Sequence, residues 1–296
     1  MTTEMTSRRN RKTTGPLPTI SSRGAWLPKR RSTRLLALLA ARNEMRFLPG
    51  YVLNVGRQVD GIVALDDGST DGSARFLESC PEVLELIRIP AERPEWDEVG
   101  NYRMLVAAAL QHGADWLISL DSDERLERGF RRRAERVISR GERRGLSGYA
   151  IRLFELWNSP DLYRADGIWG CKAPPRLFRA RRDHVFDERP LHSGKVPLQA
   201  GRDGRFPHAD LNVYHLRMIR PEDRLARRRR YELADPEGRF QPSIGYAYLT
   251  GERGVLLRRI PRGRAYERWS LRRNLRLSDT SPPTYASSAG PSRGAA

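Results

Sequence analysis

The 296-residue sequence contains only two cysteines, Cys80 and Cys171, and no long apolar run. Two cysteines are too few for a disulfide framework, and they lack metal-ligand spacing, which agrees with a reducing compartment. No segment approaches the roughly 18 apolar residues that a membrane-spanning helix needs. The apolar run at 35–41 is too short for a signal-peptide core and follows a long polar arm. We therefore expect a strand there and a cytoplasmic location.

Several short motifs are also missing. The absence of G-x-x-x-x-G-K-[ST] disfavours a P-loop kinase, and we find no internal repeat. The net charge of +18 invites a nucleic-acid function, because counterion release gives non-specific affinity for polyanions. However, no zinc-finger spacing, RNP-like aromatic motif or helix-turn-helix accompanies the arginines, which are spread from end to end with local runs at 131–133 and 227–230. We expect a solvated basic surface and no specific nucleic acid; peripheral contact with an anionic membrane is the alternative.

What is present is an alternation of strand-like and helix-like segments. Short apolar runs at 35–41 and 62–66 end in polar residues, 83–89 alternates, and a fourth strand is expected at 116–121. Amphipathic or capped segments between them predict helices at 47–59, 74–80 and 97–112. This order predicts a doubly wound parallel sheet that binds ligands at the carboxyl ends of its strands.

The second half of the sequence has a different pattern. Strands are expected at 148–157 and 211–217, and strand segments interrupted by Pro174 and Pro175 between 167 and 179. A helix rich in arginine is expected from Glu222 to Ala234, because Pro221 suits its first turn.

Two aspartates flank one small residue in DWLISLDSDERL at 115–126. At the end of a strand the backbone is still extended, so Asp121 and Asp123 should point the same way and reach one divalent cation. An isolated Asp-x-Asp is weak evidence, because most such pairs are solvated turns. Its value comes from ARNE at 41–44 and DGSTDGS at 67–73, which follow the two upstream strands.

The order and spacing of ARNE, ALDDGSTDGS and SLDSDE resemble glycosyltransferase family 2, over roughly residues 34–235. The resemblance implies an α/β GT-A fold, Rossmann-like and doubly wound with a mostly parallel sheet, and a smaller C-terminal acceptor region. It also implies inverting transfer from a nucleoside-diphosphate sugar, UDP-linked before GDP- or TDP-linked, to a hydroxyl acceptor of unknown identity.

The resemblance and composition together divide the chain into parts. Segments low in bulky apolar residues cannot offset chain entropy, so we expect both termini to be disordered. The expected parts are a disordered basic arm at 1–33, a donor half at 34–126, an acceptor half at 127–235, a C-terminal extension at 236–277 and a disordered tail at 278–296.

Five residues are candidates for binding the nucleotide. The resemblance implies that Glu44, with Asn43 beside it, faces the ribose or base, and that Asp66 or Asp67 accepts a hydrogen bond from the base. A carboxylate suits either role because it only accepts hydrogen bonds. Turn formation is the alternative for this loop. Arg103 matches a position where relatives carry Arg or Asn near the nucleotide; the alternative is a solvated helix arginine.

Asp121 and Asp123 form the expected site for Mg²⁺ or Mn²⁺, which prefer oxygen ligands. The resemblance implies that Asp121 touches the ribose or a bound water while Asp123 ligates directly. Glu124 completes the DSDE form common in the group, with a surface charge as the alternative. His215, in NVYHLR, matches the late histidine that completes the metal shell in many GT-A enzymes; packing within a strand is the alternative.

The acceptor site is expected in the second half of the chain. Trp157 and Trp169 are candidates for a sugar-stacking platform, or alternatively for the core. By resemblance, Arg176 in PRLFR lies near the acceptor or the donor phosphates. His192 in PLHSGK stands where several relatives have His-Glu, but Ser193 replaces that glutamate.

An inverting transferase needs a base to take the proton of the acceptor hydroxyl. Asp187 and Glu188 are the candidates, and spacing fixes neither. An aspartate-nucleophile phosphotransferase is disfavoured, because Arg125 stands where that class expects Thr or Val. A basic nucleic-acid- or anionic-surface-binding protein on an inactive transferase fold remains the alternative function.

Overall fold

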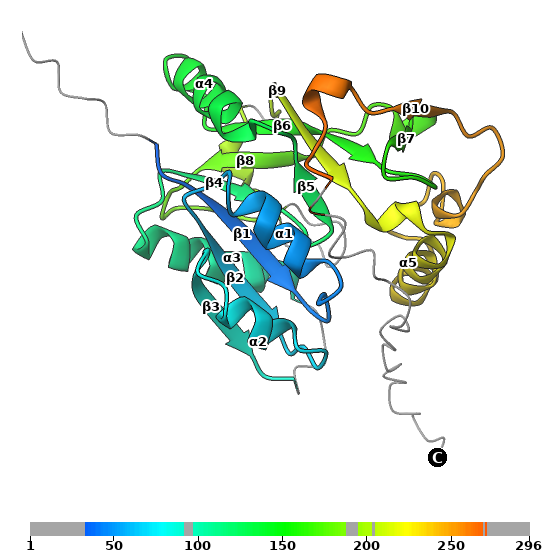
Figure 1. The fold of residues 1–296 in the computed structure, drawn as a ribbon, viewed down its shortest axis with the longest axis horizontal. Helices are drawn as coiled ribbons and strands as arrows, with labels where there is room; N and C mark the ends of the chain where they lie inside the picture. Colours follow the sequence, from blue (N-terminus) through cyan, green and yellow to red (C-terminus); the bar gives the residue numbers. More distant parts are fainter. Residues whose placement is uncertain (1–32, 92–96, 188–194, 203–204, 269, 271–296) are drawn as a thin grey trace, which may run out of the picture. The chain divides into compact units, whose positions relative to one another are not determined.

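Strand β1 (Leu35–Ala41) lies between two parallel neighbours in the computed structural model (Figure 1). On one side it pairs with β2 (Gly61–Asp67), which pairs in turn with β3 (Val83–Ile89). On the other side it pairs with β4 (Trp116–Ser119). Strands β1, β2 and β4 are almost entirely buried, which explains their continuous apolar runs. The structure describes residues 33–91, 97–187, 195–202, 205–268 and 270.

The sheet continues into the second half of the chain through antiparallel pairs. Strand β8 (Pro175–Arg179) pairs antiparallel with β4 and with β6 (Gly148–Glu155). Strand β9 (His208–His215) runs parallel to β6, and β5 (Glu124–Leu126) pairs antiparallel with β9. The order is β3-β2-β1-β4-β8-β6-β9-β5, with four parallel pairings out of seven. This mixed, mostly parallel sheet confirms the expected α/β class.

Helices cover both faces of the sheet. Helices α1 (Leu48–Val55), α2 (Ser73–Glu78) and α4 (Phe130–Glu142) share one apolar cluster with alternate residues of β1, such as Ala37. Helix α3 (Glu98–Gln111) packs on the other face, against the intervening residues of β1. This division makes the sheet doubly wound, as the alternating pattern of the sequence predicts.

Helix α5 (Pro221–Ala234) begins at the proline that suits its first turn, close to the expected bounds. A small antiparallel pair, β7 (Leu162–Arg164) with β10 (Leu257–Arg259), forms a second sheet. The described part of the chain contains no helix with both the length and the apolarity to cross a bilayer. The arm and tail were expected to be disordered at 1–33 and 278–296, and all of these residues except Thr33 lie outside the described residues.

Two of the expected elements differ from the structure, and one observed helix was not expected. The helix expected at 47–59 ends at Val55, where Gly56 and the following turn lead into β2. The segment from Gly167 to Arg179 contains a 3-10 turn and a single strand, because Pro175 stands at the first position of β8, where a missing N–H is tolerated. Helix α4 has no counterpart in the sequence prediction.

Candidate functional site

The ARNE motif and the DDGSTDGS motif lie against each other at the carboxyl ends of β1 and β2. Ala41 is in register with Asp66, the penultimate residue of β2. Asn43 adopts a left-handed backbone with φ of 55°, which asparagine tolerates. Its backbone N–H donates to Ser69 Oγ over 2.9 Å, and its Oδ1 accepts from the Thr70 N–H over 2.8 Å. Asn43 therefore holds the two loops together.

Asp66 and Asp67 end β2 and are buried, with 3% and 1% of their surfaces exposed. Asp66 Oδ2 accepts a hydrogen bond from the Ser69 N–H over 3.0 Å. Its Oδ1 accepts none from the described residues. A buried oxygen without a donor is costly, so Asp66 is suited to accept a hydrogen bond from a ligand.

The Asp-x-Asp segment forms a turn rather than an extended strand end. Strand β4 stops at Ser119, and the Glu124 N–H donates to the carbonyl of Asp121 over 3.0 Å. The expectation of an extended backbone was wrong, because the chain reverses here to enter β5. The Asp121 side chain remains 37% exposed, whereas that of Asp123 is 3% exposed.

The two aspartates take different cationic partners. Asp121 accepts from Lys195, whose own carbonyl is anchored by Ser119 at the end of β4, and it lies 3.9 Å from Arg176. Burial would raise the pKa of Asp121, but these two cations lower it to about 2. Asp123 pairs with Arg217 and His215, which against burial hold its pKa well below the usual value. Both carboxylates are therefore ionised at neutral pH.

His215 lies buried between two carboxylates. It ends β9 in register with Glu155, and its Nδ1 contacts a carboxylate oxygen of Glu155. Its Nε2 lies 3.2 Å from Asp123 Oδ2. Burial opposes the charged ring, but Glu155 and Asp123 outweigh it and raise the pKa of His215 to about 9. Glu155 also pairs with Lys172.

Asp123 and His215 are the candidate ligands for a divalent cation, which would have to displace the proton that the two carboxylates hold on the His215 ring. Asp123 Oδ1 is buried and accepts no hydrogen bond from the described residues. Glu155 behind the ring resembles the carboxylates that orient metal-binding histidines. The described residues hold no cluster of three or more side chains suited to a metal. A Mg²⁺-type site can nevertheless rely on one or two protein ligands, because water and substrate phosphates supply the rest.

Glu44 reaches the same turn from the end of β1. Its two carboxylate oxygens accept from Arg217 over 2.5 and 2.6 Å, and one also accepts from Ser122 Oγ over 2.9 Å. Burial raises the pKa of Glu44, although Arg217 opposes the shift. The ARNE motif and the Asp-x-Asp motif are thus joined through side-chain contacts as well as through the sheet.

Arg176 and Glu124 form a buried ion pair beside Asp121. Only 8% of the Arg176 side chain and 1% of the Glu124 side chain are exposed. Glu124 also accepts from the Asp121 N–H over 3.0 Å, so it is not the surface charge that was its alternative role.

Other candidates lie elsewhere. Trp157 is fully buried, and Trp169 is 4% exposed with its ring centroid 5.6 Å from that of Trp157. Both pack in an apolar cluster with Tyr246. They therefore have the core position that was the alternative to a sugar-stacking platform. Arg103 is exposed on α3, where it lines a pocket of about 370 Å³ with Arg181. Asp187 is described and partly buried. Glu188 and His192 lie outside the described residues.

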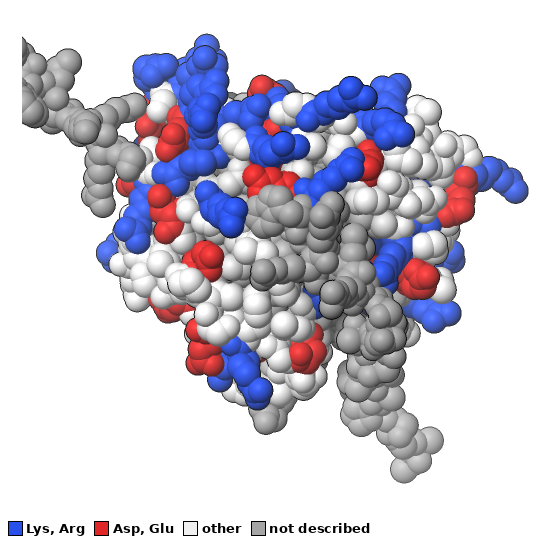
Figure 2. Space-filling view, in the orientation of Figure 1, with Lys and Arg blue, Asp and Glu red and all other residues white. Residues whose placement is uncertain are grey.

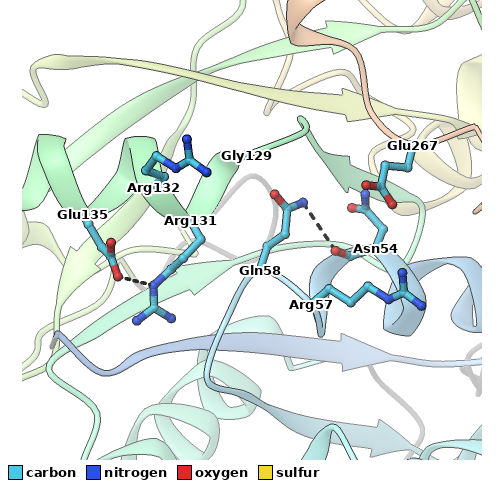
Figure 3. A pocket seen from close by; sticks show the side chains of 8 residues that line it. All are labelled: Asn54, Arg57, Gln58, Gly129, Arg131, Arg132, Glu135 and Glu267. Atoms are coloured by element: carbon cyan, nitrogen blue, oxygen red, sulfur yellow. Dashed lines mark hydrogen bonds and ion pairs between the residues drawn. The ribbon is translucent and has the colours of Figure 1, made fainter.

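A further pocket of about 400 Å³ lies by the start of α4 (Figure 3). Arg131 in its wall pairs with Glu135 and with Asp60, which precedes the amino end of β2. This pocket is therefore at the opposite end of the parallel strands from the Asp-x-Asp turn.

Sequence reasoning missed three members of the site, Glu155, Lys195 and Arg217. One signal was available for Arg217. It stands two residues after His215 in the strand expected at 211–217, and residues two apart in a strand face the same side. Nothing in the sequence shows that β6 pairs with β9 in a register that places Glu155 beside His215.

The motifs after β2, β1 and β4 meet at the carboxyl ends of three adjacent parallel strands, as the resemblance implies. The described residues form a doubly wound, mostly parallel α/β sheet, consistent with the fold that the resemblance implies. No protein-family model matches it. Uncharacterised proteins of Mycobacterium bovis and Mycobacterium tuberculosis are each 24% identical to it over 222 residues, covering 72% of this chain. The chain spans about half the length of these curated relatives, 53% in each case.

Among solved structures, TarS of S. aureus has a TM-score of 0.41 at 13% identity, covering 69% of this chain and 40% of TarS. TarS 1-349 in complex with UDP gives 0.40 at 14% identity, covering 73% of this chain and 68% of that one. A provisionally named nucleotide-diphospho-sugar transferase of Desulfovibrio desulfuricans G20 gives 0.36 at 10% identity, covering 73% and 94%. At these identities the likeness concerns the fold alone.

Proposed function

We propose that this protein is a metal-dependent glycosyltransferase that moves a sugar from a nucleoside-diphosphate sugar, UDP-linked by preference, to a hydroxyl acceptor with inversion. The observation that carries the proposal is the convergence of Glu44, Asp123 and His215 at the carboxyl ends of the strands. Ligands of doubly wound sheets bind at this edge.

Each donor-site residue has a role that suits its surroundings. Asp66 would accept a hydrogen bond from the base through its unused oxygen, and Glu44 would face the ribose. Asp123 and His215 would hold Mg²⁺ or Mn²⁺, with Asp121 beside them and Glu155 orienting the imidazole. Such an ion, when bound, neutralises negative charge on the departing nucleoside diphosphate.

The transfer breaks the bond between the anomeric carbon and the diphosphate oxygen, and its electron pair leaves with the nucleoside diphosphate. A new bond forms between the anomeric carbon and the acceptor oxygen. The hydroxyl proton passes to a base. We assign that base to Asp187 or Glu188, and the acceptor side to the region around Arg176 and His192.

Calorimetric titration of UDP, GDP and TDP, with and without Mn²⁺, tests this function. We expect one nucleoside diphosphate to bind, and to bind more tightly with Mn²⁺. Asp123→Asn should abolish the Mn²⁺ effect, and Glu155→Gln should weaken Mn²⁺ binding by about 10- to 100-fold because the imidazole loses its orienting partner. Asp210→Asn is the matched control, because the side chain of this aspartate is 87% exposed and pairs with Arg264. Absence of binding to all three nucleotides would contradict the proposal.

A further inference from the structure

Arg217 bridges two carboxylates of the donor site. It follows β9 at the start of a 3-10 turn, Arg217–Ile219. Its Nε donates to Asp123 Oδ2, and its Nη2 donates to both oxygens of Glu44. The hydrogen bonds between described residues leave its Nη1 unused. The guanidinium carbon also lies 4.9 Å from the centroid of the Phe47 ring.

Arg217 lies on the solvent side of the carboxylates that it joins. Its side chain is 21% exposed, against 14% for Glu44 and 3% for Asp123. In the neighbouring pair of Lys195 and Asp121 the cation is the less exposed partner, with 20% of the Lys195 side chain exposed and 37% of the Asp121 side chain. A ligand that enters over the strand ends would therefore meet the Arg217 guanidinium before the buried carboxylate of Asp123.

The diphosphate of a sugar donor is anionic, and the Glu44 and Asp123 side chains at the strand ends are carboxylates. A diphosphate bound at this edge therefore needs a cationic group between itself and these carboxylates. Arg217 contacts both carboxylates and is the more exposed partner in each pair.

We infer that Arg217 binds the diphosphate of the sugar donor by donating hydrogen bonds from its guanidinium to phosphate oxygens. This inference rests on the proposed function. A planar guanidinium suits diphosphate binding at this position, because it forms paired hydrogen bonds with both carboxylates and phosphates. Arg217 is thus a binding residue for the leaving group, in addition to the residues that hold the cation.

Nucleotide binding to Arg217→Gln, measured by calorimetry at saturating Mn²⁺, tests the inference. The probes are UDP, GDP and TDP and their nucleosides. Hydrogen bonds to charged groups are strong, so we expect the affinity for the preferred nucleoside diphosphate to fall by about 10- to 100-fold. The affinity for the matching nucleoside should not change, because it carries no phosphate.

Arg264→Gln is the matched control. Arg264 is 23% exposed and pairs with the fully buried Glu127, which follows the last residue of β5, so its loss removes a similar ion pair that does not include Glu44 or Asp123. It should change neither affinity. If Arg217→Gln does not fold, Arg217→Lys replaces it, and we expect a smaller loss that is still confined to the diphosphate.

Two results would overturn the inference. Equal loss of nucleoside and nucleoside diphosphate would show that Arg217 only positions Glu44 and Asp123. Unchanged binding of the diphosphate to Arg217→Gln would show that Arg217 has no role in binding, while leaving the proposed function intact. Failure of the wild-type protein to bind any nucleoside diphosphate would reject both.

Discussion

At the scale of single residues, the phenol of Tyr231 on α5 has a lowered pKa. The positive charge of Arg227 lowers its pKa, against partial burial, and Arg230 adds to the effect, so that it falls to about 8. An unperturbed tyrosine titrates near 10. Between about pH 8 and 10 the unfolded chain therefore binds more protons, and the stability contributed by Tyr231 grows as the pH rises through this window. It is lost as the pH falls through 8.

The ultraviolet absorbance of tyrosinate measures this shift. The wild-type protein should show one phenol titrating near pH 8, and Tyr231→Phe should lack it. Tyr246→Phe serves as the control. The Tyr246 hydroxyl donates to Asp235, and the pKa of Tyr246 is raised, so this change should not affect the titration near pH 8. Identical titration curves for wild type and Tyr231→Phe below pH 9 would contradict the assignment.

The sequence identified those site residues that follow an apolar run directly. Glu44, Asp66 and Asp123 belong to short motifs at strand ends, so their order along the chain was enough to bring them to one edge of a parallel sheet. Glu155 and Arg217 were missed, because their place depends on the pairing of β6 with β9 and on which charges face each other across it. The register that places Glu155 beside His215 has no local signature in the sequence.

At the scale of elements, α4 packs on β6 through a glycine. A Cβ atom at Gly141 would overlap the Tyr149 hydroxyl and lie 2.8 Å from its Cζ. That hydroxyl donates to the Val137 carbonyl over 3.2 Å, and the Tyr149 ring stacks with Trp116 at a centroid distance of 6.0 Å. The tyrosine therefore has little room to move.

Gly141→Ala should destabilise the protein by about 1–3 kcal/mol through overpacking. Helix propensity alone would favour alanine by roughly 1 kcal/mol, so the two effects predict opposite signs. Urea unfolding decides between them. Tyr149→Phe in the Gly141→Ala background should recover part of the loss, whereas Arg136→Ala on the exposed face of α4 should have little effect. A more stable Gly141→Ala protein would refute this packing argument.

The parallel strands and α3 and α5 were predicted closely, because their apolar periods and proline signals are local. Helix α4 was missed, because seven of its residues from Phe130 to Glu142 are charged and only a narrow stripe, with Ala134 and Ile138, faces the core. Strand β5 has three residues, too few for an alternating pattern to be recognised, and only its pairing with β9 defines it.

At the scale of the whole molecule, basic side chains gather over α4 (Figure 2). Arg132, Arg136 and Arg140 are exposed and four residues apart, so they form one stripe along the helix. Non-specific binding to duplex DNA should weaken with salt by about 0.9 logarithmic units per phosphate neutralised. Changing the three arginines to Gln should reduce the salt slope by up to about 2.7.

Fluorescence titration of a generic duplex over a range of salt concentrations measures that slope. Exposed Arg258, Arg259 and Arg262, changed to Gln together, provide the control away from α4. An affinity that persists at about 0.15 M salt would favour the nucleic-acid-binding alternative over charge attraction alone.

The cluster around Asp123 draws on residues from Glu44 to Arg217, contributed by both halves of the sheet. A fragment that ends before Arg217 therefore lacks part of the cluster, and ligand binding there depends on both halves of the sheet. Since a compound that binds only the native form raises the melting temperature, heating curves recorded across a library of hydroxyl compounds offer a direct route to the unidentified co-substrate.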